Sequence, residues 1–443
     1  MSTRMKMSWL LACAISVLGM NGVWAGDVTI DASKAVNVRL PVANGDAVAF
    51  KTSDGKDGWV RQISNEALPT PAYGKGHIFT GGGYSSRIFS SLDASTGKTV
   101  WSKSTQDNGP TSPVVTEKYV AYNSESCHTE VRDIEDGGLA WSEVTGGTLL
   151  TQPLVYNDVL VIPHPIMARQ SQYADNHFRM LSVSLQNFHK GWDADMTTDV
   201  LSAPVAAAGY VFFSCTDGRL FCISNRTGGE EWHAVAKATC APVVIGKTVA
   251  VTMETTKNNN QVEVGIQRYE VADGTLKDEK PLAPTLVNKA PAKFAGAGRE
   301  GMVNPAGWDY QGPKIAYANN RLFNAPGNVI NAVNLEDGKI AWRGTVVGNG
   351  LQNAADTLTS PALGKENLYL GSRAGHVLAI KQSDGTLTSA YKFSETLTTQ
   401  PILADGNIYF GTTPGKIVCL KLGDKDADGW SAWGGNAGHN KTE

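Results

Sequence analysis

The chain has 443 residues, of which 42% are hydrophobic, and a formal net charge of -3. The sequence contains no block of like charge, so its composition indicates neither nucleic-acid binding nor attraction to an anionic membrane surface. Its 47 glycines are typical of a turn-rich all-β protein.

The first 25 residues have the pattern of a secretory signal peptide. Arg4 and Lys6 precede an apolar core over residues 9–20, and small residues stand before Gly26. We expect cleavage after Ala25, export and a periplasmic location. As an alternative, residues 10–13 resemble a lipobox, which would make Cys13 a lipidated N-terminus. No other segment of the sequence approaches the roughly 18 apolar residues that span a bilayer, so we expect no transmembrane span.

Residues 27–66 contain two strand patterns, around Ala47 and around Trp59. A ring of sheets must close, and pairing an N-terminal strand into the last sheet removes two open edges. We predict that residues 46–63 close the ring in this way. Residues 429–433 compete for the same outer position, which leaves the strand order of the last sheet open. We expect the tail, residues 434–443, to be surface coil.

Between these ends the chain is divided into eight units, each opened by a proline before a short apolar run. Most spacings between successive prolines are about 40 residues, and a repeat of this length is typical of a propeller or solenoid. The eight prolines are Pro71, Pro113, Pro153, Pro204, Pro242, Pro313, Pro361 and Pro401.

Each unit contains further short runs rich in β-branched and aromatic residues, separated by turns such as Asp217-Gly218. A late aromatic residue ends most units, and we expect it to pack between neighbouring blades. These aromatics are Trp101, Trp141, Trp192, Trp232, Trp342, Tyr391 and Trp430, and the fifth unit lacks one. Four strands per unit predict an all-β, eight-bladed β-propeller of four-stranded antiparallel blades. We expect it to form a single domain over residues 26–433.

Residues 93–101 read Asp-x-x-Thr-Gly-x-x-x-Trp, and degenerate forms recur in most other units. This motif resembles the docking motif of the quinoprotein-type, PQQ-like β-propeller repeat family, over about residues 66–433. Enzymes of that family hold a PQQ cofactor at the ring axis, between a tryptophan and a disulfide of two adjacent cysteines. This sequence has no adjacent cysteine pair. The resemblance therefore favours a non-enzymatic scaffold, similar to the propeller subunit of the outer-membrane β-barrel assembly machine. It implies envelope protein partners and no cofactor.

Two units carry insertions, one between Pro163 and Met180 and one over residues 283–308. Long loops on a regular scaffold are common binding sites. A tolerated surface insertion is the alternative for both.

Five cysteines follow the signal segment, an odd number. Cys222 and Cys419 occupy the same third-strand position, which indicates packed core thiols. Cys215 and Cys240 belong to consecutive blades on one face of the ring, and we expect a disulfide between them.

The same face carries the candidates for a copper or zinc site: Cys127, His128 and His164. Adjacent residues of a strand point to opposite faces, so Cys127 and His128 could bind one ion only from a turn. Two alternatives to the scaffold therefore stay open. One is a periplasmic redox or metal-linked protein, and the other is a PQQ-dependent oxidoreductase without the usual adjacent-cysteine disulfide.

Overall fold

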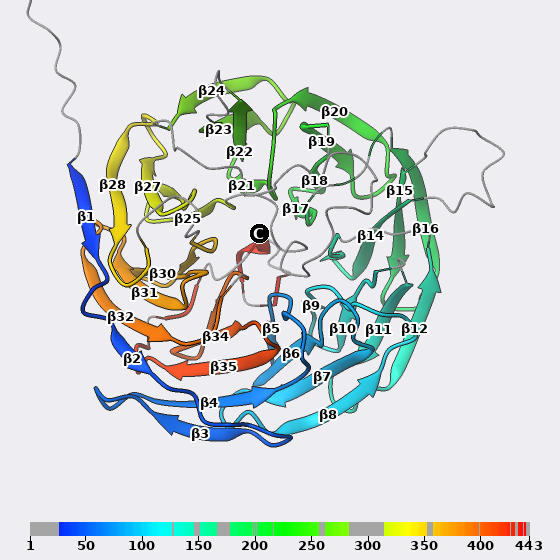
Figure 1. Cartoon of the computed structure of the whole chain (residues 1–443). Coiled ribbons are helices and arrows are strands. Elements are labelled where there is room, and N and C mark those ends of the chain that lie inside the picture. The colour runs from blue at the N-terminus through cyan, green and yellow to red at the C-terminus, as the bar shows by residue number, and fades with distance from the viewer. Residues whose placement is uncertain are drawn as a thin grey trace, which may run out of the picture.

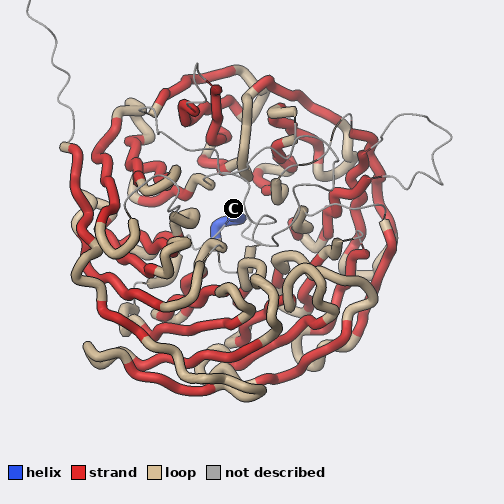
Figure 2. Tube along the Cα trace, in the orientation of Figure 1, coloured by secondary structure: helices blue, strands red, loops and turns tan. Residues whose placement is uncertain are grey.

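The structure is a computed structural model. It describes residues 26–125, 128–145, 151–165, 178–196, 198, 200, 202–215, 217–256, 262–282, 314–351, 358–397, 399–425, 427–429, 433–436 and 438–439. In this part of the chain the regular structure consists of strands and one short 3-10 helix. Eight sheets stand around a central axis, as Figure 1 and Figure 2 show. The predicted eight-bladed propeller is confirmed.

Blades 1 to 7 each have four antiparallel strands, numbered outward from the axis, and blade 8 combines strands from both ends of the chain. Blade 1 contains β5 (Ala72–Gly74), β6 (His77–Gly81), β7 (Ile88–Asp93) and β8 (Thr99–Ser104). Blade 2 contains β9 (Val114–Val115), β10 (Tyr119–Tyr122), β11 (His128–Asp133) and β12 (Leu139–Val144). Blade 3 contains β13 (Leu154–Tyr156), β14 (Val159–Pro165), β15 (Phe178–Ser184) and β16 (Lys190–Met196). Blade 4 contains β17 (Val205–Ala207), β18 (Tyr210–Ser214), β19 (Arg219–Ser224) and β20 (Glu230–Val235).

The second half of the ring repeats this order. Blade 5 contains β21 (Val243–Ile245), β22 (Thr248–Thr256), β23 (Val262–Glu270) and β24 (Leu276–Pro281). Blade 6 contains β25 (Ala316–Ala318), β26 (Arg321–Asn324), β27 (Val329–Asn334) and β28 (Ile340–Val347). Blade 7 contains β29 (Ala362–Leu363), β30 (Asn367–Gly371), β31 (His376–Lys381) and β32 (Leu387–Phe393). Blade 8 takes β33 (Ile402–Ala404), β34 (Asn407–Gly411) and β35 (Lys416–Lys421) from the end of the chain.

The ring is closed by the N-terminal part of the chain. Strand β4 (Asp57–Gln62) pairs antiparallel with β35, and β3 (Val48–Lys51) pairs with β4 at the rim. The order in blade 8 is therefore β33-β34-β35-β4-β3. This confirms that residues 46–63 close the ring and answers which terminus supplies the outer strands.

Two more N-terminal strands lie on the rim. Strand β1 (Asp27–Asp31) runs parallel to β28 outside blade 6, and β2 (Val36–Val38) runs parallel to β32 outside blade 7. We call β1, β2 and β3 the N-terminal strap. In Figure 1 the strap follows the outer edge of three consecutive blades.

The prolines that open the units stand directly before the inner strands, where a missing N–H removes no ladder hydrogen bond. Pro313 lies outside the described residues. Buried side chains of adjacent blades share common clusters, such as Phe393 of blade 7 with Phe410 and Val60 of blade 8. The blades therefore stabilise one another by burial of apolar surface between them.

The strand order also fixes the two faces of the ring. Connections between second and third strands, and between one blade and the next, lie on one face, because strands alternate in direction. We call it the loop face, and the other, which carries the tight hairpin turns, the turn face. No helix in the described residues is long and apolar enough to cross a membrane.

Candidate functional site

Described residues near the C-terminus lie at the ring axis. The 3-10 helix η3 (Trp433–Gly435) and residues 436, 438 and 439 lie there, and we call them the C-terminal plug. The N–H of Val115 donates to the carbonyl oxygen of Gly438 at 2.8 Å. Figure 2 shows this short helix near the centre of the ring. We expected residues 434–443 to be surface coil, and for the described part of this tail that expectation is wrong. Gly435, Gly438 and His439 are buried, and the last two hydrogen-bond to the start of blade 2.

Trp433 anchors the plug. It is buried in the same cluster as Ala203 of blade 4, Ala241 of blade 5 and Ile402 of blade 8. The Nζ atom of Lys314 lies 4.1 Å from the centre of its ring, a cation–π contact with a buried lysine. Trp433 thus belongs to a cluster that joins residues of blades 4, 5 and 8, and its ring contacts the lysine that precedes blade 6.

The ring of His439 lies against that of Trp433, with ring centres 4.1 Å apart and an angle of 30° between the ring planes. Its Nδ1–H donates to the carbonyl oxygen of Pro113 at 2.7 Å, and 3% of the residue is exposed. Burial, and secondarily the charge of Lys314, lower the pKa of His439 to about 3, although the Pro113 carbonyl acts in the opposite direction. The imidazole is therefore neutral at neutral pH.

Adjacent blades are joined by tryptophans on their outer strands. The indole N–H of each donates to a backbone carbonyl of the next blade, in the turn between its third and fourth strands, at 2.7–3.0 Å. The pairs are Trp101 to Ile134, Trp192 to Asn225, Trp232 to Val271, Trp342 to Gln382 and Trp59 to Ala94. These hydrogen bonds give the ring a repeated inter-blade contact.

Trp59 is one of these inter-blade tryptophans, and the sequence pattern did not reveal it. It stands on β4 opposite Cys419, and it supplies the indole of blade 8 because the N-terminal strand forms the outer half of that blade. A Cβ atom on Gly97, at φ +73°, would lie 2.4 Å from its ring, which explains the glycine of the docking motif. Trp430, which we expected in this role, lies outside the described residues.

The blades without such an indole use other contacts. In blade 5 the guanidinium of Arg268, paired with Asp278, donates to the carbonyl of Leu335, which is the equivalent acceptor of blade 6. Trp141 of blade 2 stacks on Phe188 of blade 3 at a ring distance of 6.5 Å. In blade 7 the hydroxyl of Tyr391 donates to Asp54 of blade 8 at 3.0 Å.

Within the described residues Cys215 and Cys240 are buried thiols, and no disulfide joins them. The Cys240 Sγ donates to the Ala241 carbonyl at 3.3 Å, and burial raises its pKa. The expected disulfide is thus replaced by two separately packed thiols.

Cys222 and Cys419 are also buried thiols on third strands. Burial raises the pKa of each to about 12, with the Glu231 charge adding to the effect at Cys222. The thiolate is the reactive form, so these side chains act as core packing.

The proposed metal ligands are only partly described. His128 begins β11 at the loop face, and His164 is buried near the end of β14 on the same face. Cys127 lies outside the described residues. Among the side chains that are described, no three His, Cys, Asp or Glu residues are grouped as a metal site. The site at Cys127, His128 and His164 stays a prediction.

A third histidine on the loop face, His376, is fully buried at the start of β31. Its Nδ1 lies 3.1 Å from the Ser372 hydroxyl. Burial, followed by the charge of Lys392, lowers its pKa to about 4, so it is neutral and holds the turn before its strand.

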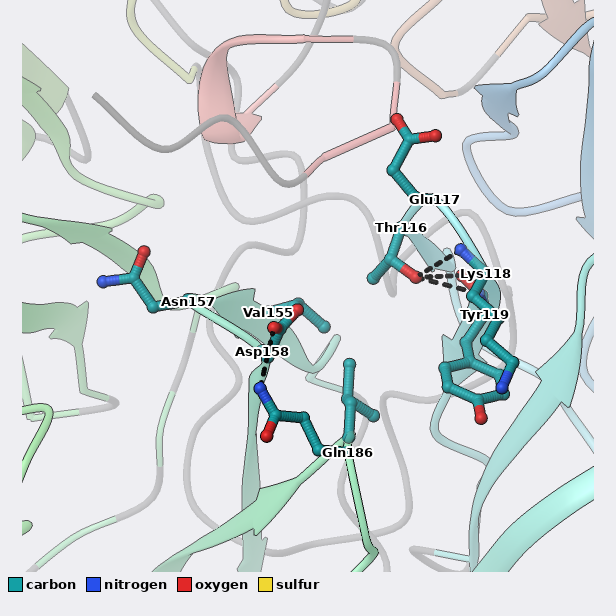
Figure 3. Close-up of a pocket in the computed structure, with 9 residues that line it drawn as sticks. Thr116, Glu117, Lys118, Tyr119, Val155, Asn157, Asp158 and Gln186 are labelled. Atoms are coloured by element: carbon teal, nitrogen blue, oxygen red, sulfur yellow. Dashed lines mark hydrogen bonds between the residues drawn. The ribbon is translucent and has the colours of Figure 1, made fainter.

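The turn face has a pocket of about 620 Å³ between blades 2 and 3 (Figure 3). Its polar lining includes Glu117, Lys118 and Asp158. Thr116 accepts hydrogen bonds from two backbone N–H groups of its own turn, and Gln186 donates to Asp158 at 3.3 Å. The side chains of this pocket thus support the turns, and the arrangement contains no activated nucleophile among the residues that line it.

The eight radial sheets and the recurring indole contacts define a β-propeller built from PQQ-like repeats. The family model described as outer membrane protein assembly factor BamB matches residues 43–277 and 289–439, and the chain belongs to this family of PQQ-like propellers.

Solved structures with the same fold have varied roles. BamB from Moraxella catarrhalis is 12% identical, with a TM-score of 0.59, over 84% of this chain and 100% of that chain. Quinohemoprotein alcohol dehydrogenase from Comamonas testosteroni is 11% identical, with a TM-score of 0.54, over 85% and 77%. The computationally designed Ika8 protein is 13% identical, with a TM-score of 0.60, over 81% and 99%. At these identities the likeness shows the fold alone. No curated protein matches the sequence.

Proposed function

We propose that this protein is an exported, non-enzymatic propeller that binds another protein in the bacterial cell envelope. The model of the family to which it belongs carries the description outer membrane protein assembly factor BamB. The pattern of residues 1–25 supports export to the periplasm.

The observation that carries this proposal is the C-terminal plug. The family resemblance makes the ring axis the expected position of a quinone cofactor. Here the chain's own Trp433 and His439 are in contact with each other and lie against the starts of the inner strands around that axis. A Cβ atom on Gly434 would lie 2.6 Å from the His439 carbonyl oxygen, so the plug is tightly packed. These residues do not fit a planar cofactor at the axis, and the sequence lacks the adjacent cysteines of the quinoprotein enzymes.

The loop face is the surface that we assign to the partner. The insertion between β14 and β15 and the connection between β24 and β25 both leave their blades on this face, as the antiparallel strand order requires. Both long connections thus start and end on one face of the ring, and long loops on a regular scaffold are common binding sites. The opposite face has tight hairpin turns.

The test is recovery of a partner from native envelopes after chemical crosslinking. Tagged full-length protein should recover a discrete protein, and a variant that lacks residues 283–308 should recover at least tenfold less. Lys118→Ala, a change in the turn-face pocket, is the control and should recover the wild-type amount.

Unchanged recovery without residues 283–308 would remove that loop from the binding surface. A stoichiometric quinone chromophore in the purified protein would overturn the non-enzymatic function itself.

A further inference from the structure

The outer edges of the eight blades are not equivalent. The N-terminal strap covers the outermost strands of blades 6, 7 and 8. In blades 1 to 5 the fourth strands β8, β12, β16, β20 and β24 are the last strands of their described sheets. An open edge presents backbone N–H and C=O groups that can pair with another extended segment.

The strap itself shows how such an edge is covered. Strand β1 pairs in parallel with β28, with Val28 opposite Gly344, two residues after Trp342. Ile30 of β1 is 1% exposed, and a Cβ atom on Gly344 would lie 2.4 Å from its Cδ1 atom. The residue two positions after the tryptophan is small. It therefore leaves space in which a β-branched side chain of the added strand can pack.

Four of the five open edges carry charge around the corresponding position. Glu143 of β12 pairs with Lys190 at 2.7 Å. In β16 the corresponding residue is Ala194, and the aspartates on both sides of it, Asp193 and Asp195, are bridged by Arg179. Strand β8 has Lys103 at this position and β24 has Lys280. Charged edge residues are a common protection against added strands.

The edge of blade 4 differs from these four. Strand β20 carries Trp232, then His233, and Ala234 at the position that Gly344 has in β28. The next residue, Val235, is 75% exposed. The second half of this edge thus combines a small residue, an exposed apolar residue and no carboxylate or lysine.

The first half of the same strand is acidic. Glu230 and Glu231 are exposed, and Glu230 accepts from His233 at 2.7 Å. In the register of β1, whose first residue Asp27 lies opposite Arg343, an added segment would begin opposite His233. The residues that precede the segment would then lie beside Glu231 and Glu230. The edge therefore favours a strand that is preceded by basic residues.

We propose that the open edge of blade 4 binds an extended segment of the envelope partner, which adds as a parallel fifth strand outside β20. The segment has Lys or Arg before its first strand residue and alternating β-branched aliphatic side chains, one of which lies over Ala234. This inference rests on the proposed protein-binding function and names the kind of segment that would be bound.

The probe is a synthetic peptide, Lys-Lys-Asp-Val-Thr-Ile-Asp, with a photoreactive side chain in place of Ile, added to the full-length protein. Crosslinks mapped by mass spectrometry should fall on Ala234 and Val235. Val235→Asp, which places a charge on the edge, should reduce crosslinking at least tenfold. Val100→Asp, at a valine of β8 that is 44% exposed, is the matched control and should leave it unchanged.

A peptide with Pro in place of Thr gives a second control, because proline interrupts the backbone pairing of a strand. It should lose crosslinking to wild-type protein. Crosslinks spread evenly over the outer strands, or equal crosslinking of wild type and Val235→Asp, would overturn the edge site.

The failure of this inference can be told apart from failure of the proposed function. If the Val235→Asp protein recovers the envelope partner at the wild-type level, the edge site is overturned and the scaffold function stands. If wild-type protein recovers no partner at all, the scaffold function is overturned as well.

Discussion

The C-terminal plug should loosen when the protein is acidified from pH 7 to pH 5. Its His439 is buried between Trp433 and the Pro113 carbonyl, with Lys314 nearby, and is bound as the neutral imidazole. Protonation would place a second positive charge beside Lys314 in a site that is closed to water.

The magnitude follows from the two pKa values. Burial lowers the pKa of His439 to about 3 in the plug, against an ordinary value of 6.5 when the tail is released. The released tail binds more protons, so plug stability is complete above pH 6.5 and falls as the pH drops from 6.5 toward 3. Each pH unit in this range costs about 1.4 kcal/mol, and at pH 5 the loss is about 2 kcal/mol, or roughly thirtyfold in the opening equilibrium.

Amide hydrogen exchange of Val115 measures this opening, because its N–H donates to Gly438 of the plug. After correction for the intrinsic exchange rate, its protection should fall roughly thirtyfold between pH 7 and pH 5. A His439→Phe variant keeps an aromatic ring without a titrating group, so its protection should not depend on pH in this range. Constant protection in the wild type would refute the reasoning, as would a His439 that titrates near pH 6.5.

Three further outcomes follow from the packing. Trp59→Ala should lower the free energy of unfolding by about 3–5 kcal/mol in a denaturant titration, because a large buried side chain and its hydrogen bond to the next blade are both lost; a loss below 1 kcal/mol would argue against its place in ring closure. Arg132→Met should lower the free energy of unfolding by about 3–5 kcal/mol in the same titration, because its ion-pair partner Glu130, which is 1% exposed, is left as a buried unpaired charge. Adding Glu130→Gln should restore part of this stability, and equal stability of the single and double variants would contradict the reasoning. Gly434→Ala should reduce Val115 protection, since its φ is +73° and its Cβ would meet the His439 carbonyl, whereas Gly45→Ala, at φ +95° in open space, should not; equal effects would refute the steric account.

The repeat made most of the fold readable from the sequence. Prolines before inner strands and turn glycines depend on local backbone geometry, so Pro71 and Gly97 mark the same positions in the sequence and in the structure. The closing strand around Trp59 could also be anticipated, because an open ring leaves two unpaired edges. Which terminus would supply the outer strand could not, since both candidates contain tryptophan and a short strand pattern.

The plug and the strap depend on contacts between distant parts of the chain. Trp433 and His439 stand in a glycine-rich tail that has no strand or helix periodicity, and their burial arises from the shape of the axis that eight blades create. The sequence around Ile30 has a strand pattern, but the packing of Ile30 over Gly344 depends on the three-dimensional arrangement of blade 6. The pairing of Cys215 with Cys240 was argued from a shared face, which does not ensure that two side chains point at each other.

The central claim is that this propeller binds a protein and is closed at its axis. The most direct test is to isolate the full-length protein from its native envelope, analyse the complex by native mass spectrometry and record its absorption spectrum. We expect a defined protein partner and no stoichiometric quinone. A stoichiometric quinone bound to the isolated protein, with no partner protein, would contradict the account.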